Sequence, residues 1–419
     1  MAVLGHAIVM GGGVAGLLAA AALAEHSDRV TLVDRDPLGV DGAEAFAPRR
    51  GVPQGGTVHR LLAVGEARME ELLPGLRKDL LAAGAAPRAT AADTASDAGT
   101  APDAGIDTPG ALWLTRPLLE GVLRRRVLAL PGLEAVQGAV GGLLTSADGS
   151  AVTGVSLRGG ELAELHGDLV VDAAGRSSRA GSWMTGLGAE RPRTLGTRVH
   201  VAYTCQRLRL AGDALPAGLE ALSLPPSEAV PFTIDLEPCG GGEHLLAVAG
   251  TSRHQPPTDL PGLLDLVAHL PGSEDATALG RALEAAEPVG EPASAKAAGA
   301  HRQLWEAVVD APEGLVHVGD AAAMFTPVYG QGMAMAAVGA VALRDHVAAL
   351  DSADGTGSGA ADGLAAPFQQ ALAELLDPAW ESTLARDLRL PGAERLLDGA
   401  AVDELPDRRD LAPALSATR

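Results

Sequence analysis

The N-terminal part of the chain alternates short and long apolar runs. Residues 6–10 form an apolar run of the length of a buried strand, residues 14–25 are rich in Ala and Leu, and residues 29–33 form a second short apolar run. A strand, a turn, a helix and a second strand in this order are typical of a parallel sheet covered by helices. The pattern predicts that an α/β domain begins here.

The following segments predict further elements of this domain. Residues 65–84 have the pattern of a helix interrupted by a proline, and a strand at 112–115 precedes a helix at 117–128. Between them, residues 88–109 are rich in Ala, Thr, Asp, Gly and Pro, which predicts a surface excursion. Short alternating runs separated by turn signals at 134–172 predict a β-meander over one face of the domain.

A second block of the chain has a different pattern. Residues 198–203, 231–236 and 245–248 have the composition of strands, and residues 259–270 and 276–286 have helical periodicity. Strands followed by helices, rather than alternating with them, indicate an α+β domain on a mixed or antiparallel sheet.

The composition is that of a globular protein. Of the 419 residues, 47% are hydrophobic and 20% are charged, and the formal net charge is −21. Such a charge repels a phosphate backbone, and no basic stripe with aromatic residues occurs, so we expect no nucleic-acid partner. With only four Phe, four Trp and two Tyr, a large pocket must be lined mainly by aliphatic and small side chains.

Cysteine usage and the N-terminal apolar run bear on the location of the protein. Cys205 and Cys239 fit neither a disulfide framework, a CxxC redox pair nor a zinc site, which predicts a reduced, cytoplasmic protein without a metal site. Residues 2–24 are almost wholly apolar, but no Lys or Arg precedes Arg29 and the glycines at 11–13 interrupt the run. We therefore expect neither a signal peptide nor a membrane span there, and no other stretch is expected to be long enough to span a bilayer.

The glycines between the first strand and the first helix have the spacing of a dinucleotide-binding turn. The sequence reads Gly11-x-Gly13-x-x-Gly16, and Asp34 ends the second strand. The first glycine allows the tight turn, the second lets the backbone approach a pyrophosphate, and the third lets the helix pack closely on the strand. Asp34 would accept hydrogen bonds from ribose hydroxyls, and Arg35 is assigned to the same site. In this context the motif predicts a dinucleotide, either NAD or FAD.

Later motifs separate these alternatives. Residues 170–176 (Val-Val-Asp-Ala-Ala-Gly-Arg) end the predicted meander, Gly319-Asp320 follows the last short apolar run, and residues 327–333 (Pro-Val-Tyr-Gly-Gln-Gly-Met) open a long helix. With these motifs the sequence resembles the flavoprotein monooxygenases of the p-hydroxybenzoate-hydroxylase type, which carry GxGxxG, DG and GD motifs in this order. The resemblance covers most of residues 5–350 and favours FAD.

Other residues are similar to a bacterial secondary-metabolism branch of this family. They are the segment at 49–55 (Arg-Arg-Gly-Val-Pro-Gln-Gly) with His59, and Trp380, Asp387 and Pro391. The branch includes the polyene epoxidases of polyether antibiotic pathways. The sequence also resembles flavoproteins that act as [4+2] cyclases and retain FAD mainly for structure.

The resemblance implies an α/β, Rossmann-like FAD-binding domain with a β-meander, an α+β substrate domain on a mixed or antiparallel sheet, and a C-terminal helical tail. The expected units are the first part of the FAD-binding domain (1–180), the substrate domain (181–310), the return to the FAD-binding domain (311–350), a linker (351–366) and the C-terminal helical segment (367–419).

The resemblance also implies roles for the motif residues. Asp320 would hydrogen-bond the ribitol chain of FAD, and the backbone amides of the Gly330-Gln331-Gly332 loop would face the N1/O2 edge of the flavin, where the following helix stabilises negative charge. An ordinary cap and a flexible glycine turn are the alternatives. The residues assigned to catalysis are Gly330, Gln331 and Gly332. Those assigned to cofactor binding are Gly11, Gly13, Gly16, Asp34, Arg35, Arg50, Arg116, Asp172, Gly175, Gly319, Asp320, Pro327, Gly330, Gly332 and Met333.

Several assigned positions leave alternatives open. Arg50 and Arg116 match positions where relatives place an arginine near the FAD phosphates or ring, and a solvated surface charge is the alternative for each. Asp172 and Gly175 would support the FAD turn and the approach of NAD(P)H, but Ala174 occupies a position that is often polar, which weighs against direct reduction by a pyridine nucleotide.

One histidine departs from the pattern of the branch. His59 stands where the branch has a His-x-His pair, with Thr57 at the first position, so a core or surface histidine is as good an interpretation as one that takes part in chemistry.

These observations lead to a main hypothesis and an alternative. The main hypothesis is an FAD-dependent monooxygenase of secondary metabolism that epoxidises or hydroxylates an apolar polyene or polyketide-like substrate through a flavin C4a-hydroperoxide, with O₂ and with NADPH, NADH or a flavin reductase as electron source. The absence of a clear phenol-deprotonating relay in the second block favours an apolar substrate. The alternative is a cyclase of the [4+2] type that retains FAD without redox chemistry.

Overall fold

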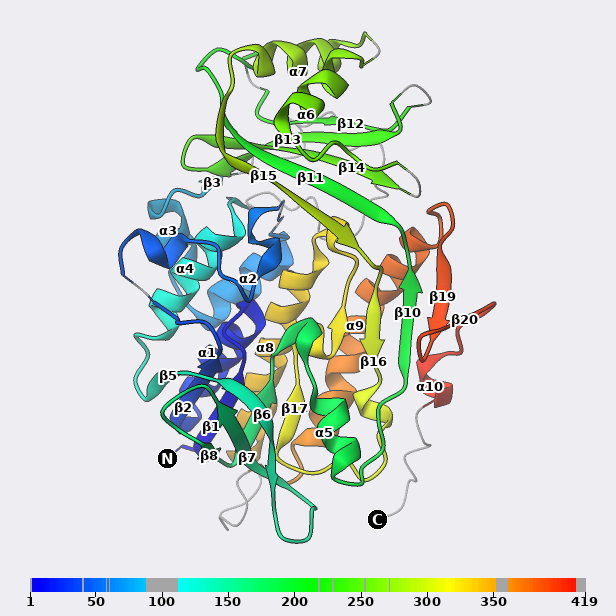
Figure 1. The fold of residues 1–419 in the computed structure, drawn as a ribbon. Coiled ribbons are helices and arrows are strands. Elements are labelled where there is room, and N and C mark those ends of the chain that lie inside the picture. Colours follow the sequence, from blue (N-terminus) through cyan, green and yellow to red (C-terminus); the bar gives the residue numbers. More distant parts are fainter. Residues whose placement is uncertain are drawn as a thin grey trace.

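The computed structural model describes most of the chain, which forms a lower body and an upper lobe (Figure 1). The described residues are 2–39, 41–57, 59, 61–87, 112–217, 219–227, 230–251, 254–270, 272–351 and 361–411. The predicted excursion at 88–109 and much of the predicted linker at 351–366 lie outside them.

A parallel sheet forms the centre of the lower body, in the strand order β17-β9-β1-β2-β5. Its strands are β1 (Leu4–Met10), β2 (Ser27–Asp34), β5 (Leu133–Gln137), β9 (Leu169–Asp172) and β17 (Leu315–His317). Helix α1 (Val14–Ala24) connects β1 to β2, which pair in parallel. The α/β fold predicted from the N-terminal pattern is therefore confirmed.

Helices and short elements surround this sheet. Helix α8 packs against α1 and α2, and α9 packs against α8. The helices of the lower body are α2 (Ala63–Leu72), α3 (Leu76–Ala82), α4 (Arg116–Val127), α5 (Ala180–Gly186), α8 (Gln331–Asp351), α9 (Ala365–Asp387) and α10 (Arg408–Leu411). The helix predicted at 65–84 is thus two helices, α2 and α3, separated at Pro74.

The meander predicted at 134–172 is present only in part. Strands β6 (Ala139–Thr145), β7 (Val152–Arg158) and β8 (Glu164–His166) form a separate antiparallel sheet. The first and last strands of the range, β5 and β9, instead belong to the parallel sheet. β9 is buried along its whole length, which explains why its apolar run does not alternate.

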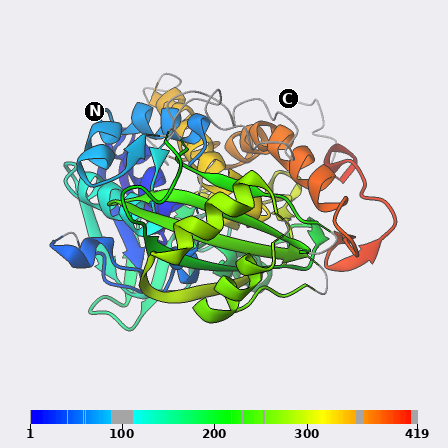
Figure 2. The same ribbon diagram turned by 90° about the horizontal axis from the view of Figure 1, so that it is seen from above.

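The upper lobe is an antiparallel sheet with two helices on its outer face (Figures 1 and 2). Its strands, in spatial order, are β12 (Leu222–Leu224), β13 (Phe232–Gly240), β14 (Glu243–Thr251), β11 (Val201–Arg209) and β15 (Glu287–Ala297). The helices are α6 (Leu260–Ala268) and α7 (Glu274–Glu284), and their apolar sides share one core with the sheet. The separate α+β block predicted from the sequence is confirmed.

A third antiparallel sheet joins the two parts. Its strands, in spatial order, are β18 (Ala323–Met324), β16 (His301–Gln303), β10 (Thr194–Arg198), β19 (Glu394–Leu397) and β20 (Ala400–Val402). The C-terminal segment is therefore not wholly helical, because β19 and β20 form a hairpin. Its turn is Asp398-Gly399, where both residues have positive φ, as the favoured two-residue hairpin turns require.

The remaining short strands form a two-stranded antiparallel pair, β3 (Ala86–Pro87) with β4 (Leu112–Trp113). The 3₁₀ turns are η1 (Ala43–Phe46), η2 (Pro53–Gly56), η4 (Gly175–Ser177), η5 (Trp305–Ala307), η6 (Gly319–Ala321) and η7 (Pro327–Tyr329).

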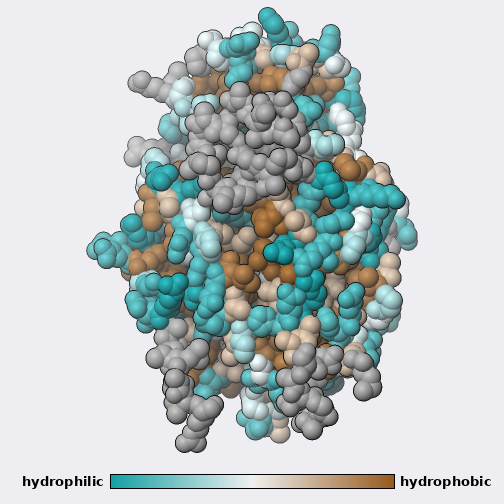
Figure 3. Space-filling model, turned by 180° about the vertical axis from the view of Figure 1, so that it is seen from behind, coloured by the Kyte–Doolittle hydropathy of each residue, from teal (hydrophilic) through white to brown (hydrophobic). Residues whose placement is uncertain are grey.

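One helix of the described chain is long and apolar enough to cross a membrane by length and composition, contrary to the expectation that no such stretch exists. It is Gln331–Leu350 of α8, with a mean hydropathy of 1.4, but 56% of it is buried inside the protein. The rear view shows brown apolar groups between teal polar ones on the lower body (Figure 3). A core helix of small apolar residues passes the same test of length and composition.

Candidate cofactor site

The glycine turn leaves the N-terminus of α1 open. Gly11 has a φ of +101°, and a Cβ placed on it would lie 2.6 Å from the carbonyl oxygen of Ala173; one on Gly16 would lie 1.7 Å from that of Gly11. Gly13 is the N-cap of α1 and has no side-chain cap. The first-turn amides of α1 therefore have no intrahelical acceptor and can bind an anion such as a diphosphate.

Asp34 lies at the end of β2, beside this turn. Its carboxylate accepts hydrogen bonds from the backbone amides of Gly12 (2.6 Å) and Asp36 (2.8 Å), which fix its orientation. A carboxylate can accept about four hydrogen bonds, so capacity remains for the hydroxyls of a sugar. The neighbouring Arg35 is exposed.

A buried carboxylate organises the arginines near the turn. Glu120 is 2% exposed and accepts hydrogen bonds from Arg116 Nε (2.7 Å) and Arg49 Nη2 (3.1 Å), with Arg124 Nη1 3.7 Å away. Burial acts to raise the pKa of Glu120, but the charges of Arg116 and Arg49 hold it below its usual value. Arg116 also comes within 4.0 Å of the position of a Cβ on Gly13. Three guanidinium groups therefore lie around Glu120 beside the turn, and Arg49 is also within 3.4 Å of Asp34 and 3.9 Å of Asp36.

Arg49 reaches the glycine turn directly. Its Nη2 donates to the carbonyl of Gly12 (2.8 Å), whereas its buried Nη1 has no hydrogen-bond acceptor and lies 3.4 Å from Asp34 Oδ1. Arg50, which the resemblance assigned to the cofactor, is exposed. Arg49 and Arg50 are adjacent in the chain, but only Arg49 contacts the glycine turn.

The Gly319-Asp320 turn packs against the start of α1. A Cβ placed on Gly319 would come within 2.5 Å of Ala15 Cβ, and one on Gly332 would lie 3.9 Å from Asp320 Oδ1. The Asp320 carboxylate has no hydrogen-bond partner in the described part of the chain. Burial raises its pKa, and the charges of Arg116 and Arg176 oppose that shift. The Gly319-Asp320 motif and the glycine turn at the start of α1, which are about 300 residues apart in the sequence, therefore lie side by side.

The segment 327–333 forms the other end of the site. Gly330 has a left-handed conformation (φ 69°), and its amide donates to the carbonyl of Pro327 (3.1 Å), so this amide is used inside the turn. Helix α8 begins at Gln331, and the amides of Gln331 and Gly332 lie in its first turn, where they have no intrahelical acceptor. Met333 is 6% exposed and packs in the core.

These features fit FAD. The open α1 N-terminus and the Arg49 guanidinium, whose Nη1 makes no hydrogen bond, suit a diphosphate. Asp34 suits a ribose, and the unpartnered Asp320 carboxylate suits the hydroxyls of a ribitol chain. The first turn of α8 offers amides and a positive helix end where negative charge would lie. In the described residues, no group of three or more His, Cys, Asp or Glu side chains is placed to hold a metal ion.

Comparison with known proteins identifies relatives of the chain. No protein-family model matches it. Protein Rv3254 of Mycobacterium tuberculosis is 31% identical over 400 residues, which cover 91% of this chain and 80% of the relative. The chain belongs to the Rv3254 family.

Solved structures share the fold at low sequence identity. The Diels-Alderase PyrE3 of pyrroindomycin biosynthesis has a TM-score of 0.61 at 16% identity, covering 92% of this chain and 73% of that one. A tetrameric 2-methyl-3-hydroxypyridine-5-carboxylic acid oxygenase has 0.59 at 20%, covering 92% and 91%. The flavin-dependent brominase Bmp2 has 0.58 at 15%, covering 92% and 90%. This Rv3254-family chain therefore has the fold of flavin-dependent oxygenases, as the motifs predicted.

Asp172 does not line the site but holds the turns that form it. It is fully buried, and its carboxylate accepts from the amide of Ala174 (3.0 Å) and lies 3.2 Å from His317 Nδ1. His317 stacks on Trp305 with 3.5 Å between ring centroids, and Trp305 Nε1 donates to the carbonyl of Ala321 in the Asp320 turn (3.0 Å). Asp172 therefore acts through the turns that it holds. Gly175 is closer to the site: a Cβ on it would lie 3.8 Å from Asp320 Cβ.

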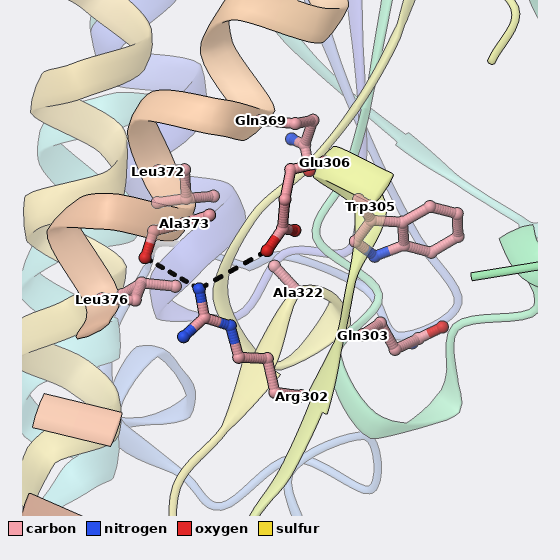
Figure 4. Close-up of a pocket in the computed structure, with 9 residues that line it drawn as sticks. All are labelled: Arg302, Gln303, Trp305, Glu306, Ala322, Gln369, Leu372, Ala373 and Leu376. Atoms are coloured by element: carbon pink, nitrogen blue, oxygen red, sulfur yellow. Dashed lines mark hydrogen bonds and ion pairs between the residues drawn. The ribbon is translucent and has the colours of Figure 1, made fainter. Parts of the chain in front are cut away.

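A buried network of ion pairs and hydrogen bonds joins the segment around Trp305 to helix α9. Figure 4 shows its central residue, Arg302, with Glu306 and Ala373. Arg302 Nη1 donates to Asp377 (2.8 Å), and its Nη2 donates to the carbonyl of Ala373 (2.7 Å) and lies 3.7 Å from Glu306. Arg408 of α10 donates two further hydrogen bonds to Asp377. The space enclosed beside Arg302 is about 10 Å³, which is no more than a water molecule needs. The network is structural packing and leaves no room for a ligand.

The underside of the upper sheet, named here the aliphatic face, lies opposite the cofactor site. Val328 of the 327–333 segment packs against it. Its buried residues are Val199, Val201, Tyr203, Cys205, Cys239, Leu245, Ala247 and Ala297. Asp235 and Glu237 pair directly with Ala247 and Leu245 across β13 and β14, so two carboxylates share this side of the sheet. Cys205 and Cys239 are buried and do not form a disulfide.

His59 lies near Arg116 at the edge of the site. Its Nδ1 donates to the carbonyl of Thr57 (2.9 Å). Burial, and then the charge of Arg116, lower the pKa of His59 to about 4, so the imidazole is neutral at pH 7. A neutral imidazole can accept a hydrogen bond here, but it has no positive charge that would attract a phosphate.

Sequence reasoning missed three residues of the site, Arg49, Glu120 and Arg176. Glu120 lies four residues after Arg116, a spacing that places both on one face of α4, and this could have indicated the pair. Nothing in the Arg49-Arg50 dipeptide distinguishes its two members. Arg176 follows Gly175 in the 170–176 motif, and nothing in that motif assigns it a role of its own.

Proposed function

We propose that the chain is an FAD-dependent monooxygenase that inserts oxygen into an apolar small molecule. The observation that carries the proposal is the meeting, beneath the aliphatic face, of the open α1 N-terminus, Arg49, the unpartnered Asp320 carboxylate and the first turn of α8. These groups suit the diphosphate, the ribitol chain and the pyrimidine edge of a flavin dinucleotide.

When bound, FAD supplies the oxygen activation, which no side chain of the protein can perform alone. The α1 amides, Arg49 and Arg116 hold the diphosphate, Asp34 holds the ribose, and Asp320 holds the ribitol hydroxyls. The amides of Gln331 and Gly332 stabilise negative charge at the pyrimidine edge of the ring. The aliphatic face excludes water and orients the substrate by shape.

The finer parts of the proposal concern substrate and reductant. Epoxidation or hydroxylation of a polyene or polyketide-like molecule needs no side-chain base, which suits a face whose buried residues are mostly aliphatic. We propose O₂ as co-substrate and NADPH, NADH or a partner flavin reductase as the electron source. The absence of a disulfide between Cys205 and Cys239 suits a cytoplasmic protein, and antibiotic biosynthesis is the proposed setting.

The first test is the flavin content of the purified protein. We expect a yellow protein with about one FAD per chain, and a colourless protein that takes up no flavin would end the proposal. Arg49→Gln and Arg50→Gln form a matched pair of adjacent substitutions. Loss of the contact to the Gly12 carbonyl and of a diphosphate partner should weaken FAD binding about tenfold in Arg49→Gln. Because Arg50 is exposed, Arg50→Gln should weaken FAD binding less. Equal losses of FAD affinity in the two variants would show that Arg50 also belongs to the cofactor site.

A non-redox cyclase is the second candidate, and the likeness in fold to the Diels-Alderase PyrE3 favours it. Anaerobic addition of NADPH or NADH with a polyene substrate separates the two. Bleaching of the flavin, followed by oxygen-dependent product, supports the monooxygenase. Turnover of a substrate without reductant or oxygen would establish the cyclase instead.

A further inference from the structure

One face of helix α9 contacts the chain on both sides of Pro327. Trp380, Thr383 and Asp387 follow one another at intervals of three and four residues, so they lie on the same face of the helix. Each of them is at most 4% exposed. Trp380 and Asp387 are among the residues that resemble the secondary-metabolism branch, and that resemblance gives neither of them a role. Their contacts in the structure indicate one.

Two of the three residues hold the chain just before and just after the turn at Pro327. The Trp380 ring packs edge to face on Phe325, with 6.3 Å between the ring centroids. The Thr383 hydroxyl donates a hydrogen bond to the side-chain carbonyl of Gln331, the first residue of α8. The Gln331 side chain is thereby directed to α9, and its backbone amide is the group left for a cofactor.

Asp387, the last residue of α9, makes the central contact. Its fully buried carboxylate accepts hydrogen bonds from three hydroxyls, those of Tyr329 (3.0 Å), Thr326 (2.7 Å) and Thr197. Burial and the charge of Asp387 raise the pKa of Tyr329, so the phenol stays protonated at pH 7 and remains a donor. The guanidinium of Arg386 lies over the Tyr329 ring, 4.9 Å from its centroid.

Thr197 gives this arrangement a rigid anchor. It lies in β10, the central strand of the third sheet, which pairs with β16 on one side and β19 on the other. Its hydroxyl also accepts a hydrogen bond from the amide of Ala300 (3.0 Å), which fixes its orientation. Asp387 therefore ties the 327–333 segment to the middle of a sheet, and not to another loop.

The ties to Asp387 fix the turn that leads into α8. Within the turn, the amide of Tyr329 donates to the carbonyl of Thr326 (3.2 Å), and that of Gly330 donates to the carbonyl of Pro327 (3.1 Å). The Thr326 and Tyr329 hydroxyls hold both ends of this turn on one carboxylate, and Gln331 follows directly. A shift of the turn would move the first-turn amides of α8 away from a ligand held at α1, and the interaction of amide dipoles with charge weakens with distance.

We propose that Asp387 is a positioning residue for the flavin chemistry, and that it holds the 327–333 segment so that the amides of Gln331 and Gly332 face the N1/O2 edge of the flavin. The inference rests on the proposed function, because it takes FAD to lie in the cofactor site. Amides at this edge favour reduced over oxidised flavin, since reduction places negative charge there. The role of Asp387 should therefore be visible in the ratio of the two affinities, which sets the midpoint potential.

The test is the midpoint potential of flavin-loaded Asp387→Asn, measured by reduction with xanthine oxidase against a reference dye. An amide accepts fewer hydrogen bonds than a carboxylate, so the turn loosens. We expect binding of oxidised FAD to change by less than about threefold, and the preference for reduced flavin to fall about tenfold, which lowers the two-electron potential by about 30 mV.

Asp377→Asn is the matched control on the same helix. It weakens hydrogen bonds from Arg302 and Arg408, outside the 327–333 segment. This variant should unfold at a lower urea concentration than the wild type but keep its midpoint potential. A loss of stability alone is thus separated from a change in the position of the segment.

A second pair of variants decides the question if Asp387→Asn does not fold. Thr326→Val keeps the shape of the side chain and removes one donor to Asp387, whereas Thr326→Ser keeps the hydroxyl. We expect Thr326→Val to lower the preference for reduced flavin about threefold and Thr326→Ser to leave it unchanged.

Three outcomes would overturn the inference: an unchanged potential in flavin-loaded Asp387→Asn, an equal fall in Asp377→Asn, or equal effects of Thr326→Val and Thr326→Ser. Wild-type protein that takes up no FAD would reject the proposed monooxygenase and this role together. The expected fall in potential, in a protein that turns over its substrate without reductant or oxygen, would support the role of Asp387 and reject the monooxygenase alone.

Discussion

The parallel-sheet side and the upper-sheet side, which meet at Val328, are built on different principles. The side formed by the parallel sheet depends on backbone geometry and charge, with glycines that admit no Cβ and a buried carboxylate among arginines. The side formed by the upper sheet has mostly small aliphatic residues, and Val328 packs against it. The first arrangement suits a ligand of fixed structure such as a cofactor, and the second suits a substrate recognised by shape. Substitutions on the two sides should therefore differ in their effects on flavin binding and on stability.

The largest effect is expected at Gly16. In Gly16→Ala the new Cβ would overlap the carbonyl oxygen of Gly11, so the turn must move. We expect loss of FAD binding and destabilisation by about 3 kcal/mol or more, measured by flavin content and urea unfolding. Gly280→Ala in α7, where a Cβ meets nothing within 4 Å, is the matched control and should stabilise by about 0.5–1 kcal/mol. A flavin-replete Gly16→Ala protein would contradict the importance of the turn.

Glu120→Gln should come next. The substitution leaves Arg49, Arg116 and Arg124 close together without their shared anion, and removal of one partner from a buried ion cluster costs about 3 kcal/mol. Urea unfolding of the flavin-free protein measures the loss, and added FAD should recover part of it because the diphosphate replaces the missing charge. Glu71→Gln, in a largely exposed pair with Arg344, should cost at most about 1 kcal/mol. Equal losses would mean that the cluster is not effectively buried.

Asp320→Asn should separate binding from stability. The carboxylate has a raised pKa because it is buried, so its ionisation destabilises the folded flavin-free protein as the pH rises through that pKa. The asparagine variant should therefore unfold at slightly higher urea concentration at pH 7, yet bind FAD about 10–100-fold more weakly, because an amide accepts fewer hydrogen bonds from hydroxyls. Titration of the apoprotein with FAD measures the affinity. Parallel losses of stability and affinity would show that Asp320 is a cap instead.

The contrast between the two sides also explains what could be predicted from the sequence. The glycine spacing, Asp34 and Asp320 are constrained by the backbone positions they occupy, and the structure brings them together as expected. The helices and the α+β block followed from periodicity. The terminal hairpin was missed although Asp398-Gly399 is a strong turn signal, because it follows a long helical pattern.

Other features depended on tertiary packing and had no local signal. The choice between Arg49 and Arg50 is made by Glu120, which lies 71 residues beyond Arg49. Strands β5 and β9 have the apolar pattern of the meander they flank, and only pairing with β2 and β1 assigns them to the parallel sheet. The aliphatic face has no motif, because its shape is set by residues from many segments.

The smallest effect is expected on the aliphatic face, at Cys239. The thiol is 4% exposed, and burial raises its pKa to about 12, so it should stay unreactive toward a thiol reagent at pH 8 until the protein is unfolded. Cys239→Ala should cost only about 1 kcal/mol, and Cys239→Ser about 1–3 kcal/mol, since the hydroxyl is buried among aliphatic groups. Neither should change the flavin content, measured by absorbance. A fall in flavin content in Cys239→Ala would show that the aliphatic face and the cofactor site are coupled, because packing of the upper sheet would then set the geometry of the cofactor site.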